Sequence, residues 1–247
     1  MSGHNKWSTI KRKKGAADAK RGKLFSRVVK EIQMAVKEGG PVPENNPRLR
    51  LAIQNAKGAN MPKENVERAI SKASSESENI QEVTFEGYAP HGIALFIECV
   101  TDNNQRTVSN IRALFNKRGG SLGTNGSLSF IFDHKGIFTV PNEGIDPESF
   151  ELEIIDAGVE DIELNDDVFM ITTAIQDFGS VQKKLDEMGI KIENAQLQRI
   201  PVETKKLDLE SAQKVLKIIE EFEDLDDVQN VYHNLELTEE LMAAMED

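Results

Sequence analysis

The chain has 247 residues, of which 38% are hydrophobic and 29% are charged, and its formal net charge at pH 7 is −12. This composition is typical of a globular protein with one large domain or two to three small ones. The single cysteine, Cys99, excludes a disulfide framework or a cysteine zinc site within one chain. No apolar run approaches membrane-spanning length, and the basic N-terminus is not followed by the apolar h-region of a signal peptide. We therefore expect a cytoplasmic protein without membrane contact.

The charges are distributed unevenly along the chain. Residues 1–75 contain 17 Lys and Arg against 6 Asp and Glu, a balance of +11. The rest contains 13 basic and 36 acidic residues, a balance of −23. Such asymmetry is typical of a polyanion-binding region attached to an acidic body. Because the acidic body repels nucleic acid, the basic region is expected to lead the approach.

The first 23 residues form the most basic stretch, and only Asp18 opposes its cations. Few large apolar residues are present, so this stretch is expected to be flexible when free. It is either a solubilising tail or an arm that neutralises phosphates. Trp7 either stacks on an unpaired base or fills a neighbouring apolar patch. The cations are Lys6, Lys11, Arg12, Lys13, Lys14, Lys20, Arg21 and Lys23.

Three helices are predicted next. Apolar residues between Leu24 and Val36 recur at three- and four-residue spacing, and Gly39-Gly40-Pro41 ends that helix. Asn46 can cap a second helix whose first position is Pro47. Pro62 begins a third, which is followed by a polar linker. These elements predict a basic helical nucleic-acid-binding domain over residues 1–77.

This helical region is predicted to bind the phosphate backbone, and Arg48 and Arg50 are taken as further contacts. The connections between its helices differ from the compact turn of a helix-turn-helix motif. None of its helices presents Arg, Asn or Gln together at base-reading spacing. Backbone binding is therefore favoured over sequence readout.

The middle of the chain predicts strands Val83–Tyr88 and Ile93–Val100, helix Asn104–Lys117, and a strand over Ser127–Phe132. Glycines at 119, 120, 123 and 126 lie between the last two elements. This loop lacks the Lys-Ser/Thr ending of a phosphate-binding P-loop and follows a helix, so an ordinary turn is favoured. The basic residues leading into it, Arg112, Lys117 and Arg118, are taken as additional phosphate contacts.

Residues 136–201 predict the order β-α-β-β-α-β, which is the ferredoxin-like pattern. A helix capped by Asp208 and a strand over Val228–Leu235 follow, and these two elements would complete the earlier β-β-α-β module. The fold class expected is therefore α+β and multidomain, with a helical N-terminal domain and two ferredoxin-like α/β domains. One α/β domain, residues 135–203, is inserted into the other, which comprises residues 80–134 and 204–240.

Patterns typical of catalysis are missing from the sequence. The four histidines are dispersed without metal-ligand spacing, and no serine nucleophile motif is present. Cys99 lies in an apolar strand, where a core role is favoured. The acidic residues between Glu220 and Asp227 are interpreted as a solvated face. We therefore expect no enzyme, no cofactor, no metal and no small-molecule substrate.

Several segments resemble the YebC family over nearly the whole chain. They include Gly3–Lys11, Asp18–Lys23, Asn46–Arg50, Asp102–Thr107, the loop at 119–126 and Asp227–Asn234. Relatives often carry glycine at the position of Ala89. The resemblance implies a helical first domain and two α/β domains, the third inserted in the second.

The resemblance leaves the target open. Bacterial members are designated probable transcriptional regulators that bind DNA, whereas other relatives act in translation, including ribosome-associated factors that relieve stalling at proline runs. Duplex DNA and ribosomal RNA both require a cationic surface. A protein-interaction adaptor that uses the acidic body is a third hypothesis, which would leave the basic arm unexplained.

Overall fold

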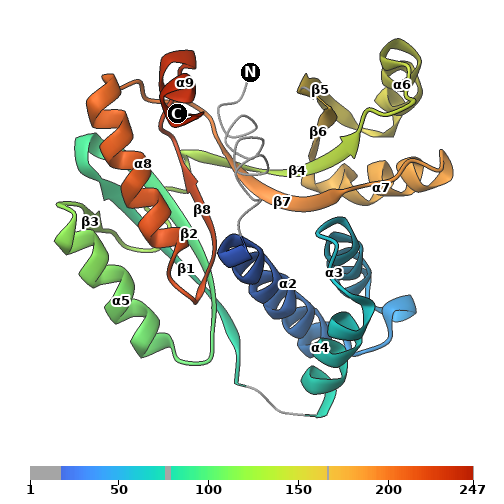
Figure 1. The fold of residues 1–247 in the computed structure, drawn as a ribbon, viewed down its shortest axis with the longest axis horizontal. Helices are drawn as coiled ribbons and strands as arrows, with labels where there is room; N and C mark the ends of the chain where they lie inside the picture. The colour runs from blue at the N-terminus through green and yellow to red at the C-terminus, as the bar shows by residue number, and fades with distance from the viewer. Residues whose placement is uncertain (1–17, 76–78, 166, 247) are drawn as a thin grey trace. The chain divides into compact units, whose positions relative to one another are not determined.

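The structure is a computed structural model that describes residues 18–75, 79–165 and 167–246 (Figure 1). These residues form two compact units. The first unit comprises residues 18–75 and 134–198, and the second comprises residues 79–133 and 199–246. Each unit therefore contains two segments that are distant in the sequence.

The first unit begins with three helices: α2 (Asp18–Gly39), α3 (Pro47–Gly58) and α4 (Lys63–Ser75). Their apolar faces enclose a small core that includes Ile32 and Leu49, both fully buried. The buried side chain of Asn46 fixes the connection between α2 and α3. Its Oδ1 accepts from the Leu49 amide at 2.9 Å, and its Nδ2 donates to the Ala35 carbonyl at 2.6 Å and the Gly40 carbonyl at 2.8 Å. The predicted cap is confirmed.

The first unit also contains most of a four-stranded sheet. Its elements are β4 (Phe132–Pro141), α6 (Pro147–Ile154), β5 (Val159–Asn165), β6 (Val168–Ala174), α7 (Phe178–Glu187) and β7 (Asn194–Pro201). The strand order is β5-β6-β4-β7. The core of this sheet is rich in buried aromatic and branched residues, and Leu51 of α3 packs against it. Helix α3 is thereby attached to the sheet.

The second unit is built around a sheet with the strand order β3-β1-β2-β8. Strands β1 (Gln81–Ala89) and β2 (Ile93–Thr101) pair in antiparallel fashion through a turn in which His91 has φ 63°. Strand β8 (Val228–His233) pairs with β2, although more than 120 residues separate them in the chain. Strand β3 (Ser121–Leu122) forms the other edge. The C-terminal segment thus completes a sheet begun by residue 81.

Helices α5 (Asn104–Lys117) and α8 (Leu209–Glu223) cover one face of this sheet (Figure 1). Phe115 and Phe222 contact each other between them, with ring centroids 4.6 Å apart. The short helix α9 (Glu239–Glu246) adds Leu241 to the same core. A smaller apolar cluster, which includes Phe96 and Tyr232, is formed by the alternate side chains of the strands. The sheet therefore contributes buried apolar side chains from both of its faces.

The predicted strand over Ser127–Phe132 is wrong. Residues 125–131 form successive turns, and β4 begins only at Phe132. Leu128 and Phe132 are buried, which explains the strand-like pattern, but the amide of Leu128 is bound by a side chain instead of a neighbouring strand. Strand β3 forms earlier, inside the glycine-rich segment.

In the described parts of the chain, no helix is long and apolar enough to cross a membrane.

Candidate nucleic-acid interface

Six of the predicted contact residues, Lys6, Trp7, Lys11, Arg12, Lys13 and Lys14, lie outside the described residues. Lys20 and Arg21 belong to the first turn of α2, and only their backbone is described. Their helical backbone places them on an element that the core of the first unit holds in place. The assignment of these eight residues to nucleic-acid binding stays a prediction.

Helix α2 continues the basic character of the N-terminus. Lys23, Arg27 and Lys30 follow one another at four- and three-residue spacing, so they share one side of the helix. The buried residues of α2 begin only at Ile32, in its C-terminal half. Residues 22–31 of the helix are therefore more accessible than its C-terminal part, and they carry Lys23, Arg27 and Lys30.

Arg48 and Arg50 have structural partners. Arg48 donates from Nε to Glu31 at 3.0 Å and from an Nη to Glu38 at 2.7 Å, which ties α3 to α2. Arg50 donates to the carbonyls of Pro43 and Glu44 at 2.7 and 2.9 Å. A phosphate contact by either arginine would have to replace these bonds. The sequence alone did not indicate these bonds, because the partners lie 6 to 17 residues away.

The remaining three predicted cations lie in the second unit, and they differ in whether they have a protein partner. Arg118 donates through two nitrogens to Glu221 of α8, with Nε at 2.7 Å from the carboxylate. Arg112 and Lys117 are exposed on α5. The structure gives those two side chains no hydrogen bond or ion pair with any residue it describes. They are therefore available to a phosphate, whereas Arg118 supports the packing of α5 beside α8.

The glycine-rich loop binds a carboxylate of the protein itself. Glu86 is buried on β1, and its carboxylate accepts from the amides of Gly126 at 2.7 Å and Leu128 at 2.6 Å. The Ser127 hydroxyl donates to the same group at 3.3 Å, and the Gly123 amide donates to the Glu86 carbonyl at 2.7 Å. These donors of the loop are thus already used, which agrees with the interpretation of this segment as a structural turn.

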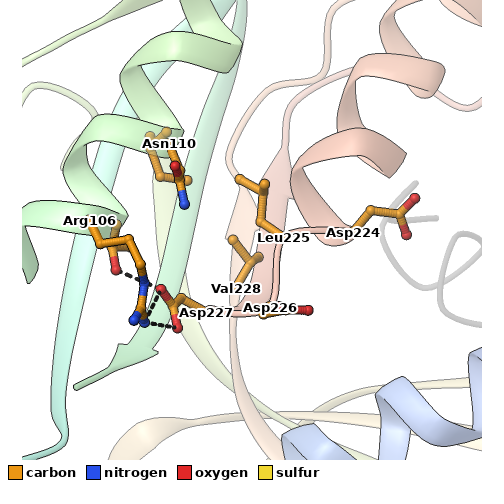
Figure 2. Close-up of a pocket in the computed structure, with 9 residues that line it drawn as sticks. Arg106, Asn110, Asp224, Leu225, Asp226, Asp227 and Val228 are labelled. Atoms are coloured by element: carbon orange, nitrogen blue, oxygen red, sulfur yellow. Dashed lines mark hydrogen bonds and ion pairs between the residues drawn. The ribbon is translucent and has the colours of Figure 1, made fainter. Parts of the chain in front are cut away.

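A cavity of about 450 Å³ lies between α5 and the residues that follow α8 (Figure 2). Arg106 donates to both carboxylate oxygens of Asp227, at 3.0 and 3.1 Å, and to Asp102 at 2.7 Å. The hydrogen bonds to Asp227, and then those to Asp102, raise the pKa of Arg106 above its ordinary value. The Thr107 hydroxyl also donates to Asp227, at 2.8 Å. The acidic segment interpreted as a solvated face therefore supplies an internal partner for α5.

A second polar cluster, which the sequence did not indicate, lies on β2 and β8. Burial raises the pKa of Glu98, although hydrogen bonds from Asn230 and Tyr232 and the charge of Arg199 act in the opposite direction. Arg199 lies 3.4 Å from Glu98 and stacks over Phe96, with its guanidinium carbon 4.0 Å from the ring centroid. The pairing of β2 with β8 brings Asn230 and Tyr232 to Glu98, and Arg199 is supplied by β7 of the other sheet.

No group of three or more His, Cys, Asp or Glu in the described residues is arranged to hold a metal ion. The cavity of Figure 2 presents hydroxyl, carboxylate and guanidinium groups that bind one another. Its residues do not form a nucleophile and base pair, because Thr107 donates to a carboxylate that Arg106 already neutralises.

Comparison with known proteins decides the family. Residues 5–76 match the model of the TACO1/YebC protein N-terminal domain, and residues 80–235 match that of the TACO1/YebC second and third domain. The chain belongs to the TACO1/YebC family. The resemblance seen in the sequence is thus confirmed, and the structure has the α+β fold expected for it, with helices followed by two four-stranded sheets.

Relatives of this TACO1/YebC chain match it over nearly their full length. A probable transcriptional regulatory protein of Rubrobacter xylanophilus is 48% identical over 98% of both chains. A protein with the same designation from Amoebophilus asiaticus is 52% identical over 95% of this chain and 98% of its own. The crystal structure of a conserved hypothetical protein from Aquifex aeolicus, 45% identical, superposes with a TM-score of 0.83 over 91% of this chain and 94% of that one. The names of the relatives support a family of regulators.

Proposed function

We propose that this protein is a non-enzymatic, cytoplasmic regulator of gene expression that binds duplex DNA through its basic N-terminal region. The observation that carries the proposal is the charge separation, +11 in residues 1–75 against −23 in the remainder. Relatives designated probable transcriptional regulatory proteins support it as well. No small-molecule substrate, cofactor or metal is part of the proposed function.

The charge separation explains how an acidic protein can bind a polyanion. Cations that neutralise phosphates release condensed counterions, which favours binding strongly at low salt. The acidic body is repelled at the same time, so the protein meets the duplex with its basic region first. Arg48, Arg50 and Arg118 already have protein partners. The cations of the chain are most concentrated in residues 6–30, so we assign most of the affinity to that stretch and a smaller part to Arg112 and Lys117.

The test compares the full chain with a variant in which Lys11, Arg12, Lys13 and Lys14 are replaced by Glu. Binding to a fluorescent duplex is measured by anisotropy between about 50 and 300 mM salt, a range over which phosphate neutralisation has a large effect on affinity. Without these cations, which neutralise about four phosphates, the slope of log K against log salt is expected to fall by about 3 to 4. A duplex affinity and salt slope identical to those of the unchanged chain would refute the proposal.

A matched control reverses four exposed lysines of the acidic body, Lys183, Lys191, Lys206 and Lys217. This control changes the net charge by the same amount as the test variant. It is expected to weaken binding far less, because those lysines lie outside the basic region. Equal losses for both variants would mean that net charge alone governs binding.

Ribosomal RNA is a second candidate target, favoured by one specific observation. Phe130 is 75% exposed on the loop whose amides Glu86 holds. An exposed aromatic ring on a fixed loop suits stacking with an unpaired base, which RNA offers more often than duplex DNA. Sedimentation of the protein from a lysate treated with a DNA-specific nuclease, which leaves the ribosomes intact, distinguishes the two targets. Comigration with ribosomes that is abolished by charge reversal at residues 11–14 would favour RNA and a role in translation.

A further inference from the structure

Helix α5 carries a continuous polar stripe on its exposed surface. Gln105, Ser109, Arg112 and Asn116 are separated by four, three and four residues, so they align along one side of the helix. All four are exposed, and together they line a shallow depression. The structure gives their side chains no hydrogen bond or ion pair with any residue it describes. The stripe therefore has no role in holding the second unit together.

The other sides of α5 are engaged within the second unit. Thr107, Ile111 and Phe115 face the core. Arg106, next to Gln105, is rotated from it by about 100° around the helix and binds Asp227 (Figure 2). The acidic residues that follow α8 line a pocket together with Arg106 and Asn110, and the stripe lies on a different side of α5.

The composition of this stretch is unusual for an acidic protein. Residues 103–132 contain no Asp or Glu, although they contain Arg106, Arg112, Lys117 and Arg118. Asn and Ser are weaker helix formers than Glu or Lys, so a helix face that served only solvation would favour the charged residues. The stripe combines weak helix formers, local positive charge and the absence of carboxylates. This combination is complementary to a polyanion with hydrogen-bonding edges.

We propose that the α5 stripe reads base edges in the major groove of duplex DNA. The major groove is about 12 Å wide and admits a helix, and α5, with 14 residues, is about 21 Å long. Glutamine and asparagine can pair with the N6 and N7 edge of adenine, and arginine can pair with the O6 and N7 edge of guanine. The inference rests on the proposed function: the basic N-terminal region supplies affinity, and the stripe supplies sequence preference.

The test uses the full chain and a library of random duplexes, from which tight binders are selected and sequenced. The stripe variant carries Gln105→Ala, Arg112→Ala and Asn116→Ala. It is expected to lose the preference, with the affinity ratio of selected to scrambled duplex falling by roughly 5- to 150-fold for each side chain that pairs with a base. Its affinity for the scrambled duplex is expected to fall only by the small phosphate contribution of Arg112, which the single variant Arg112→Ala measures separately. The control variant, with Asn110→Ala on another side of α5 and Gln176→Ala and Lys217→Ala on other elements, all at exposed positions, should keep the preference.

Each outcome bears on the proposal. Circular dichroism and thermal unfolding first establish that both variants are folded. An unchanged consensus and ratio in the stripe variant would overturn the inference, as would a wild-type protein that binds duplexes without any preference. In both cases the salt-dependent binding through residues 11–14 would still stand. If the wild-type protein bound no duplex, or only structured RNA, the proposed function would fail and the inference with it.

Discussion

The side-chain amide of Asn55 forms two hydrogen bonds with the backbone of Ala195, one as donor and one as acceptor. Its Nδ2 donates to the Ala195 carbonyl at 2.8 Å, and its Oδ1 accepts from the Ala195 amide at 2.9 Å. The pair joins α3 to strand β7, 140 residues later in the chain. The backbone groups of Ala195 thus bond to a side chain of α3 and not to a neighbouring strand. This specific contact joins the helices of the first unit to its sheet.

One turn further along α3, Gly58 lies directly against the same segment. A Cβ atom at position 58 would lie 1.7 Å from the carbonyl oxygen of Glu193. Gly58→Ala is therefore expected to destabilise the first unit, although alanine favours a helix by about 1 kcal/mol. The measurement is the urea midpoint of the full chain. Gly179→Ala in α7, where the new methyl would meet nothing within 4 Å, is the control and should be neutral or stabilising. Equal midpoint shifts would contradict the close approach.

The buried Asn46 is expected to contribute more stability than an ordinary helix cap. Asn46→Ala removes the cap of α3 and leaves two backbone carbonyls without their donor, so a decrease of about 2 to 4 kcal/mol in the free energy of unfolding is expected. Asn103→Ala removes a cap with one exposed bond to the Arg106 amide, and a decrease of about 1 kcal/mol is expected. Denaturant unfolding of the two variants measures the difference. A smaller effect at Asn46 than at Asn103 would refute it.

Glu86 is predicted to hold the glycine-rich loop. Glu86→Gln replaces one acceptor oxygen with a donor that faces amide and hydroxyl donors, and a decrease of about 2 to 4 kcal/mol in stability is expected. Hydrogen exchange offers a local measurement, because the amides of Gly126 and Leu128 should exchange faster in the variant. Amides in α6, in the other unit, serve as the internal reference. Unchanged protection of the two loop amides would show that the carboxylate is not their anchor.

The raised pKa of Glu98 predicts a definite pH dependence. The carboxyl titrates near 4.5 when unperturbed, and burial raises its pKa in the folded protein. The folded state then keeps a proton that the unfolded chain releases, so this group lowers the free energy of unfolding as the pH rises above 4.5. Glu98→Gln lacks this effect. The stability of the variant relative to wild type should therefore increase with pH from 4.5 until the folded pKa is passed.

Urea unfolding of both proteins between about pH 4.5 and 7.5 provides the measurement. Arg199 is deprived of its carboxylate partner in the variant, which adds a cost. Because arginine stays charged throughout this range, that cost is constant and does not affect the slope. A stability difference that is flat or decreases with pH would contradict the assignment.

Local patterns predicted most of the elements but few of the interactions between them. Helix α5 begins and ends at the predicted residues, because its apolar spacing and the Asn103 cap are both local signals. The strand expected at 127–132 failed because the deciding partner, Glu86, lies about 40 residues away. In the same way, Arg48 and Arg118 looked like free cations in the sequence, although Glu31 and Glu221 occupy them. Side-chain pairings of this kind depend on the tertiary fold.

The site was predicted to a different extent in each unit. The basic residues before position 15 lie outside the described structure, so their role rests on charge alone. The polar stripe on α5 was not predicted, because it lies outside the basic region of residues 1–75. Its signal was present in the sequence, as the run of residues 103–132 without a carboxylate.

The pairing of β2 with β8 determines when the protein can finish folding on the ribosome. β2 ends at residue 101 and β8 ends at residue 233, a separation of 132 residues. At about 5 to 20 residues per second, translation takes roughly 7 to 26 s to cover that interval. During this time one edge of β2 is without its final partner, and an open edge can pair with another nascent chain. The whole sheet of the first unit is synthesised within the same interval, so the sheet that begins first is the last to close.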